Sequence, residues 1–321
     1  MLKVGVPDAV DPELHRLLPV GISLELIPLP PTRKVDVDFW IAPPWTNQAE
    51  RQLPFLEGLR VIQATVAGVD GLLKLTPPGV TLCDARGVHN ISTAEWTVAA
   101  ILACTKYFPQ FRDLQHAGIW SRRKEAEERY YALHPPLKRP YPHILCEELH
   151  SQQVLIVGYG AIGRAIEDRL QPFGVNITRI ARTPRAGVFG VDKLPELLPS
   201  ADVVVLIVPF TTATTGMIGA TELALMKQGA LLVNAARGPV VHTDALLDAL
   251  NAGRIRAAID VTDPEPLPDG HPLWTAPNLF ITPHIAGSTP MFMVRGMQFA
   301  AAQISRYLAG EPLENVVTGD Y

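Results

Sequence analysis

The chain has 321 residues, enough for two domains of ordinary size. Its formal net charge of −4 argues against a nucleic-acid-binding surface, and no stretch of 18 uninterrupted apolar residues predicts a membrane span. The N-terminal residues Met1–Pro7 resemble a first strand rather than a signal peptide. The three cysteines form no C-x-x-C pair, which indicates buried thiols in a reducing cytoplasm and predicts no metal site.

Residues 1–92 alternate short apolar runs with helical patterns, which predicts a parallel sheet covered by helices on both faces. The predicted strands are Leu2–Val6, Ser23–Ile27, Val37–Ile41, Arg60–Ala64 and Val80–Cys83. A long helix is expected to begin near Ser92 or Thr93 and to run towards Phe108.

Residues 113–150 interrupt this alternation. The segment has a polar part, rich in arginine and glutamate, that begins at Ser121, and a proline-rich part that begins at His134. A loop of this length inside a compact domain is usually functional or reaches to a partner, and a solvated excursion is the alternative.

A glycine-rich turn follows the next apolar run. Gly158, Gly160 and Gly163 have the spacing G-x-G-x-x-G, between a predicted strand and an amphipathic helix. The first glycine permits a tight turn, the second lets a pyrophosphate approach the backbone, and the third lets the helix lie close to the sheet. The start of the helix, at Ala161 and Ile162, offers N–H groups and a positive dipole end to phosphates. The pattern therefore predicts a dinucleotide-binding strand–turn–helix.

Strand and helix patterns then alternate to the end of the chain. The strand candidates are Ile177–Ala181, Ala201–Val208, Ala230–Ala235, Ala257–Val261 and Leu279–Thr282. With the strand before the glycine turn, they predict a doubly wound sheet of the dinucleotide-binding type. A last helix, at about 290–309, is long enough to return to the first domain.

Three side chains suited to acid–base chemistry follow strands of this second part. Arg237 lies at the edge where open α/β sheets bind ligands, and its guanidinium can bind a carboxylate through two hydrogen bonds. Glu265 lies in a proline-rich loop after the next strand, and His284 follows the last strand. Reduction of a 2-oxoacid needs a carboxylate clamp, a hydride donor and a proton donor, which arginine, a nicotinamide and an imidazolium supply. A carboxylate beside the histidine would favour its charged form and orient the ring.

The chain resembles the D-isomer-specific 2-hydroxyacid dehydrogenase family, because its glycine turn and its A-R-G, D-V-x-x-x-E-P and T-P-H-x-x-G segments occur in that family's order. The resemblance implies an α/β fold, with a Rossmann-type doubly wound cofactor domain plus a discontinuous flavodoxin-like α/β substrate domain. Residues 1–92 and 287–321 would form the substrate domain. Residues 93–286 would form the cofactor domain, with a dimerisation arm at about 113–150, so a homodimer is expected.

The resemblance also implies roles for single residues. Arg237 would bind and polarise the substrate, His284 would act as the general acid or base, and Glu265 would tune His284. The backbone at Ala67 and Gly68 would bind the substrate carboxylate. The implied cofactor contacts are Gly158, Gly160, Ala161, Ile162, Gly163, Pro209 on the adenine side, Ala235, Ala236, and Asp260 at the nicotinamide amide.

The choice of cofactor rests on a departure from the family pattern. Members that prefer NAD carry an acid roughly 20 residues past the glycine turn, which holds the ribose 2′-hydroxyl. Here Ala181 takes that place, and Arg182, Thr183 and Arg185 follow it. A carboxylate would repel a 2′-phosphate, whereas arginine and threonine can bind one, so NADP(H) is favoured over NAD(H). The alternative is that Arg182 and Arg185 are merely solvated.

The leading hypothesis is an oxidoreductase that transfers a hydride between NADP(H) and a small 2-oxoacid or D-2-hydroxyacid of the glyoxylate or hydroxypyruvate type. Two alternatives stay open, a phosphoglycerate-type dehydrogenase and a dinucleotide-sensing, corepressor-like binding protein. Formate dehydrogenases of this superfamily have a glutamine where Glu265 stands, which argues against that chemistry. No basic cluster beyond Arg237 is evident for a substrate phosphate, so we expect a short, unphosphorylated acid.

Overall fold

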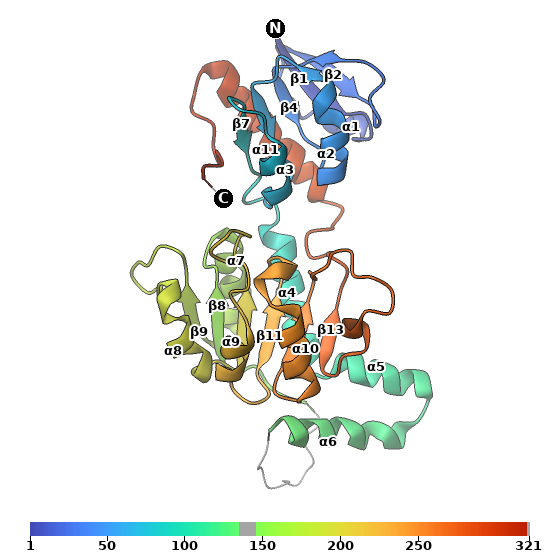
Figure 1. Ribbon diagram of the computed structural model, residues 1–321, viewed down its shortest axis with the longest axis vertical. Helices are drawn as coiled ribbons and strands as arrows, with labels where there is room; N and C mark the ends of the chain where they lie inside the picture. The colour runs from blue at the N-terminus through green and yellow to red at the C-terminus, as the bar shows by residue number, and fades with distance from the viewer. Residues whose placement is uncertain (135–145, 320–321) are drawn as a thin grey trace. The chain divides into compact units, whose positions relative to one another are not determined.

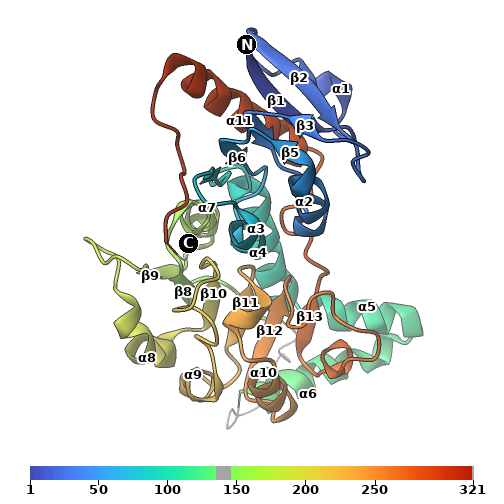
Figure 2. The ribbon, with the colours of Figure 1, turned by 45° about the horizontal axis from the view of Figure 1, so that its top comes forward.

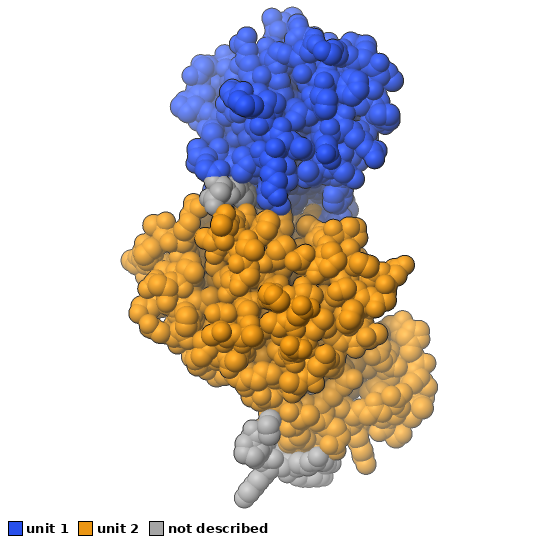
Figure 3. Space-filling model, in the orientation of Figure 1, with its two compact units in different colours: residues 1–89, 288–321 blue, residues 90–287 orange. Residues whose placement is uncertain are grey.

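The computed structural model describes residues 1–134 and 146–319, and the chain divides into two units. Unit 1 comprises residues 1–89 and 288–321, and unit 2 comprises residues 90–287 (Figure 3). The sequence predicted domain boundaries after residues 92 and 286, and the two units divide after residues 89 and 287.

Unit 1 is built on a five-stranded parallel sheet with the strand order β2-β1-β4-β6-β7. These strands are β1 (Leu2–Pro7), β2 (Ile22–Ile27), β4 (Phe39–Ile41), β6 (Val61–Gln63) and β7 (Thr81–Cys83). The order is that of flavodoxin-like folds, which confirms the predicted α/β class of this unit. The paired β3 (Val35–Asp36) and β5 (Leu56–Glu57) lie outside the predicted strands, because two residues are too few to show a period.

Helices cover both faces of the unit 1 sheet. They are α1 (Pro12–His15), α2 (Thr46–Gln52), α3 (Asp70–Leu75) and α11 (Phe292–Ala309). Helices α1 and α11 pack against one face of the sheet, and α2 and α3 pack against the other (Figure 2). Along β4, Phe39 and Ile41 join the first layer and Trp40 joins the second, because side chains alternate along a strand. The last helix therefore returns to the first part of the chain, as predicted.

Unit 2 contains a six-stranded parallel sheet with the order β13-β12-β11-β10-β8-β9. Its strands are β8 (Gln153–Val157), β9 (Asn176–Ile180), β10 (Val203–Leu206), β11 (Leu231–Asn234), β12 (Arg256–Ile259) and β13 (Leu279–Ile281). A parallel bridge between Ile180 and Phe189 extends the sheet beyond β9. The strand order reverses between β8 and β10, which confirms the doubly wound fold.

Two helical layers enclose the unit 2 sheet (Figure 1). The first consists of α4 (Asn90–Thr105) and α7 (Ala161–Leu170), and the second of α8 (Leu194–Leu197), α9 (Ala220–Leu225) and α10 (Thr243–Asn251). In β8, Ile156 faces the first layer, whereas Leu155 and Val157 face the second. Because the strand is buried on both faces, its sequence is a continuous apolar run.

The arm differs from its prediction. Two helices, α5 (Phe108–Ala117) and α6 (Lys124–Leu133), occupy much of the segment predicted as a loop. The loop prediction was wrong for α6 because its lysine, glutamate, arginine and alanine residues favour helix. Helix α4 also ends early, because Tyr107 has a left-handed φ of 55° that ends one helix and starts another. The proline-rich part, 135–145, lies outside the described residues.

The cysteines only partly follow their prediction. Cys83 is buried and Cys104 is half-buried, but Cys146 is exposed, so the expectation of a buried thiol is wrong there. Cys146 lies near the end of the arm, between α6 and the first strand of the unit 2 sheet. Within residues 1–134 and 146–319, no helix is both long and apolar enough to cross a membrane.

Candidate active site

Strand β8 leads directly into the glycine turn and helix α7. Gly158 has a φ of 106°, which other residues rarely adopt, and a Cβ there would lie 2.4 Å from the Ile207 carbonyl oxygen. At Gly163 a Cβ would lie 2.9 Å from the Gly158 carbonyl oxygen, so the absent side chain lets α7 pack on the turn. Gly160 differs, because a Cβ there would have the Gly158 carbonyl oxygen, at 4.0 Å, as its nearest neighbour beyond the adjoining residues.

The open space beside Gly160 is the feature that fits a dinucleotide. Gly160 is the N-cap of α7, and the helix begins with Ala161 and Ile162. The first N–H groups of a helix have no partner within the helix, and they attract anions together with the helix dipole. A pyrophosphate can therefore approach the backbone here and be bound by N–H groups.

Further predicted cofactor contacts follow the ends of neighbouring strands. Arg182 and Thr183 come after β9 and are exposed, and Pro209 comes after β10 and is also exposed. The Pro209 carbonyl oxygen accepts a hydrogen bond of 2.7 Å from the Thr214 hydroxyl. The carboxyl ends of parallel strands share one sheet edge, so these residues flank the glycine turn.

A buried asparagine shapes the loop that carries Arg237. Asn234 ends β11, and its amide oxygen accepts from the Ala236 N–H at 3.0 Å while its NH₂ group donates to the Arg237 carbonyl oxygen at 3.0 Å. Arg237 Nη1 donates to the Ala236 carbonyl oxygen at 2.8 Å. These bonds hold Ala235, Ala236 and Arg237 at the sheet edge.

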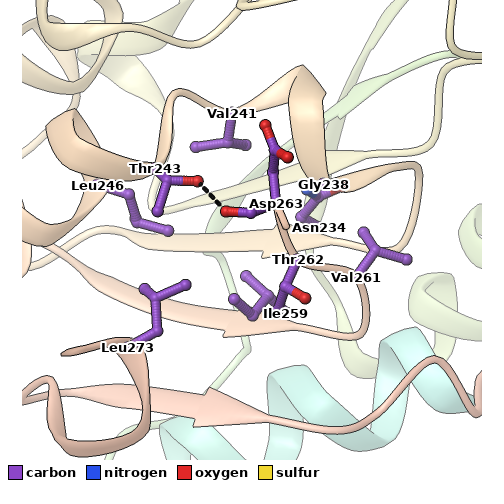
Figure 4. A pocket seen from close by; sticks show the side chains of 10 residues that line it. All are labelled: Asn234, Gly238, Val241, Thr243, Leu246, Ile259, Val261, Thr262, Asp263 and Leu273. Carbon is purple, nitrogen blue, oxygen red and sulfur yellow. Dashed lines mark hydrogen bonds between the residues drawn. The ribbon is translucent and has the colours of Figure 1, made fainter. Parts of the chain in front are cut away.

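Gly238 lets the Arg237 loop pack on the loop that carries Glu265. A Cβ on Gly238 would lie 1.9 Å from the Thr262 carbonyl oxygen, so no larger residue fits without backbone movement. The Thr243 hydroxyl donates to the Asp263 carbonyl oxygen at 2.8 Å and ties α10 to the same loop (Figure 4). The cavity enclosed there has a volume of about 10 Å³, which is too small for a substrate.

Asp260, directly after β12, holds the segment that contains the histidine. Its Oδ1 accepts from the Thr282 hydroxyl at 2.6 Å and from the Ile285 N–H at 2.8 Å, and its Oδ2 accepts from the Ala286 N–H at 2.8 Å. Burial raises the pKa of the Asp260 carboxyl, although these donors and the charge of His284 oppose the rise. Its observed contacts are thus within the protein, and its contact with a nicotinamide stays a prediction.

His284 and Glu265 form a direct pair. The His284 N–H donates to the Asp260 carbonyl oxygen at 2.7 Å, which supports a left-handed φ of 54° at the histidine. Nδ1 of His284 lies 2.5 Å from Oε1 of Glu265, and the two side chains are 40% and 37% exposed. Because Nδ1 faces the carboxylate, Nε2 is the nitrogen available to a ligand.

The electrostatics of the pair favour an ionised carboxylate. Burial alone would raise the pKa of Glu265, but the hydrogen bond and charge of His284, together with the charge of Arg237, hold it below its ordinary value. The contact with Nδ1 also fixes the orientation of the His284 ring. Glu265 thus holds the ring of His284, a potential proton donor, near the guanidinium of Arg237.

The structure brings Arg237, Glu265 and His284 together at one edge of the unit 2 sheet. Ala67 and Gly68 lie in unit 1, in the loop between β6 and α3. The sequence interpretation did not single out Asn234 and Thr282, although both orient the loops of the site. A polar residue that ends an apolar strand is the signal that could have identified them.

The sequence of this chain is similar to those of known proteins. A family model described as "D-isomer specific 2-hydroxyacid dehydrogenase, NAD binding domain" matches residues 98–286. The chain is 34% identical over 265 residues to the glyoxylate reductase/hydroxypyruvate reductase of Homo sapiens, covering 79% of this chain and 76% of that protein. It is 33% identical over 293 residues to the D-3-phosphoglycerate dehydrogenase of Methanocaldococcus jannaschii, covering 88% of this chain and 52% of that protein.

Solved structures show the same fold. The crystal structure of a D-isomer specific 2-hydroxyacid dehydrogenase from Xanthobacter autotrophicus Py2, in complex with NADPH and MES, superposes with a TM-score of 0.77. The two sequences are 26% identical, and the match covers 98% of each chain.

Proposed function

The chain belongs to the D-isomer specific 2-hydroxyacid dehydrogenase family of NAD(P)-dependent oxidoreductases that act on a CH–OH group, and we propose that it uses NADP(H) and a small 2-oxoacid or D-2-hydroxyacid. The proposed substrate is of the glyoxylate or hydroxypyruvate type. The observation that carries the proposal is the 2.5 Å contact between His284 and Glu265, with the charge of Arg237 close enough to lower the Glu265 pKa.

The proposed reduction divides the work among these residues. Arg237 binds the substrate carboxylate and polarises the carbonyl group, and the backbone at Ala67 and Gly68 is a further proposed carboxylate contact. When bound, the nicotinamide cofactor would supply the hydride for the carbonyl carbon. His284 gives its Nε2 proton to the carbonyl oxygen, which leaves a 2-hydroxyacid and a neutral imidazole. Glu265 orients the ring and favours its charged form.

Support for NADP(H) comes from the segment after β9. Ala181 offers no carboxylate to a ribose 2′-hydroxyl, and Arg182 and Thr183 follow it on the exposed sheet edge. The relative from Xanthobacter autotrophicus was crystallised with NADPH. The pyrophosphate would bind at the Gly158–Gly163 turn, with Pro209 and Asp260 as further proposed contacts.

A cavity of about 460 Å³ lies in unit 1, next to the loop that carries the proposed carboxylate contacts. Thr65, two residues before Ala67, belongs to its lining. Among the residues that line it there is no lysine or arginine, and the charged residue is Asp11. The cavity therefore offers a phosphate no cationic side chain. The phosphoglycerate-type alternative is nevertheless kept as a second candidate because of the 33% identical relative.

The function is tested by measuring turnover of NADPH and NADH with glyoxylate, hydroxypyruvate and phosphohydroxypyruvate. We expect the highest kcat/KM with NADPH and an unphosphorylated acid, and chiral chromatography should find the D product of hydroxypyruvate. A strong preference for the phosphorylated acid would support the second candidate, and an L product would contradict the proposed arrangement. Cofactor binding without any turnover would favour a dinucleotide-sensing protein.

A homodimer through the arm is the proposed assembly. Ile119 and Trp120 in the arm are 47% and 84% exposed, and Phe108, just before it, is 61% exposed, so large apolar side chains are gathered on this segment. Light scattering at micromolar concentration should find twice the chain mass of 35.0 kDa. Trp120→Ser should weaken the dimer, whereas Trp274→Ser, at a 48% exposed residue outside the arm, should not. A monomeric parent protein would overturn this assembly.

A further inference from the structure

Two buried glutamines of unit 1 form a direct pair close to the loop that carries Ala67 and Gly68. Gln63 is the last residue of β6 and Gln303 lies in α11, and the two residues are 0% and 1% exposed. Nε2 of Gln303 donates to Oε1 of Gln63 at 3.1 Å. Burying two amides is costly unless their hydrogen bonds are made. None of the roles assigned above uses either residue.

The amide of Gln63 joins the ends of two neighbouring strands. Its Nε2 donates to the Ala64 carbonyl oxygen at 2.8 Å and to the Asp84 carbonyl oxygen, directly after β7, at 3.2 Å. The Ala85 N–H also donates to the Val66 carbonyl oxygen at 2.9 Å. The loop after β6 therefore begins at a point that both side-chain and backbone hydrogen bonds hold.

Gln303 connects this point to residues 314–317. Its Nε2 also donates to the Glu314 carbonyl oxygen at 2.8 Å, and its Oε1 accepts from the Glu314 N–H at 3.0 Å. The segment continues into an antiparallel bridge between Val316 and Cys83, the last residue of β7. Both polar atoms of the Gln303 amide thus have partners, and a buried polar network that is satisfied in this way rigidifies its surroundings.

Helix α11 contacts the start of the same loop a second time, through a glycine. Gly296 precedes Gln303 by seven residues, which is about two helical turns, so both lie on one face of α11. A Cβ at Gly296 would lie 3.2 Å from the Cβ of Thr65 and 3.3 Å from the Thr65 carbonyl oxygen. The helix backbone therefore packs closely on Thr65, two residues before Ala67.

We propose that Gln63 and Gln303 are positioning residues for substrate binding, an inference that rests on the proposed function. The backbone at Ala67 and Gly68 is the proposed contact of the substrate carboxylate, and N–H groups bind an anion well only when their directions are fixed in advance. The amide pair and the Gly296 contact hold the start of that loop. The pair thus controls substrate affinity through the loop and contacts neither substrate nor cofactor.

The kinetic test compares Gln303→Met with Gln52→Met, because both residues are buried glutamines of unit 1. Gln52 donates through Nε2 to the carbonyl oxygens of Ile27 and Pro28, where β2 ends at the opposite edge of the sheet. Methionine is unbranched and flexible like glutamine but has no amide to donate a hydrogen bond.

Gln303→Met should raise KM for glyoxylate roughly 5- to 30-fold, change kcat by less than about twofold, and leave KM for NADPH unchanged. The reason is that a carboxylate contact weakened equally in the ground state and the transition state raises KM alone. Gln52→Met should keep all three quantities at their parent values.

Gly296→Ala tests the same loop by a different route. The new methyl group would press on Thr65, whereas alanine favours a helix more than glycine does, so stability should be kept. We expect KM for glyoxylate to rise roughly two- to tenfold, because a small displacement of a binding group weakens its contact. The unfolding temperature should stay near that of the parent.

Hydrogen exchange measures the loop itself, without substrate or turnover. In Gln303→Met the Ala85 N–H, which donates to the loop, should exchange roughly tenfold faster or more, while the amides of unit 2 keep their parent rates. In Gln52→Met the faster exchange should instead be found at the Asp8 N–H, which donates to the Ile27 carbonyl oxygen at 3.0 Å.

The results separate this inference from the proposed function. A parent protein that neither binds nor reduces 2-oxoacids would contradict the proposed function, and the exchange rates would still decide whether the amide pair holds the loop. If the parent is active but Gln303→Met raises KM no more than Gln52→Met does, the positioning role is wrong. Faster exchange of Gln303→Met throughout unit 1 would show general destabilisation and would also overturn the inference.

Discussion

Replacing His284 with alanine is expected to lower the rate of 2-oxoacid reduction by roughly two to four orders of magnitude. The variant loses the group that would protonate the carbonyl oxygen, while the glycine turn is unaffected. Stopped-flow or steady-state kinetics with saturating NADPH measures the loss. Fluorescence titration with NADPH should give the parent affinity, which separates lost chemistry from lost cofactor binding. Turnover near that of the parent enzyme would show that His284 is not the proton donor.

A companion variant, Glu265→Gln, tests the electrostatic coupling of the pair. The pKa of Glu265 lies below its ordinary value, so its carboxylate is charged throughout the working range and stabilises the imidazolium. The variant has a neutral amide beside Nδ1 in place of that charge, and the proposed reduction requires a protonated His284. The alkaline fall of the reduction rate should therefore move to lower pH. An unchanged pH profile would refute the coupling, and Asp263→Asn, at an exposed carboxylate of the same loop, is the control.

Asp260→Ala is expected to damage both stability and activity. Three donors, the Thr282 hydroxyl and the N–H groups of Ile285 and Ala286, lose their acceptor. A buried donor without a partner costs about 1–3 kcal/mol, and exposed Ile285 can turn to water, so we expect the free energy of unfolding to fall by about 2–4 kcal/mol. The bond from the His284 N–H to the backbone carbonyl of residue 260 remains, but residues 282, 285 and 286 on either side of His284 lose their anchor, so kcat should fall.

Urea unfolding and steady-state kinetics measure these two effects. Asp260→Asn keeps the size of the side chain but replaces one acceptor oxygen with an NH₂ group, so its losses should be smaller than those of the alanine variant. Asp269→Ala removes an exposed carboxylate from the following loop and should behave like the parent. If Asp260→Ala keeps parent stability and parent kcat, the hydrogen bonds of Asp260 do not hold the histidine loop.

The sequence predicted those parts of the molecule whose pattern is local. Strands β8 and β10 are buried on both faces, so each appears as a continuous apolar run. The glycine turn was predicted because a φ of 106° at Gly158 and a close helix at Gly163 both require glycine. The ends of strands were less accurate, since the predicted Ala201–Val208 contains only Val203–Leu206 as hydrogen-bonded strand.

The arm is a segment whose structure was predicted wrongly from the sequence. Its polar composition predicted a loop, but helix α6 needs no wide apolar face when its residues have high helix propensity. The short strands β3 and β5 form because residues 21 positions apart in the chain pair, as Val35 does with Leu56. No local period in the sequence predicts such a pairing.

The candidate reactive residues Arg237, Glu265 and His284 were identified from the sequence, because each follows a strand of a recognisable parallel fold. Their geometry was decided by tertiary structure. The 2.5 Å contact of His284 with Glu265 joins residues 19 positions apart, and it depends on Asp260 and on the packing of Gly238 against Thr262. Hydrogen bonds and close contacts between loops depend on three-dimensional distance, which residue order does not encode locally. The sequence therefore indicates which reactive side chains follow the strands, whereas the distances and angles between these side chains are set only by the folded chain.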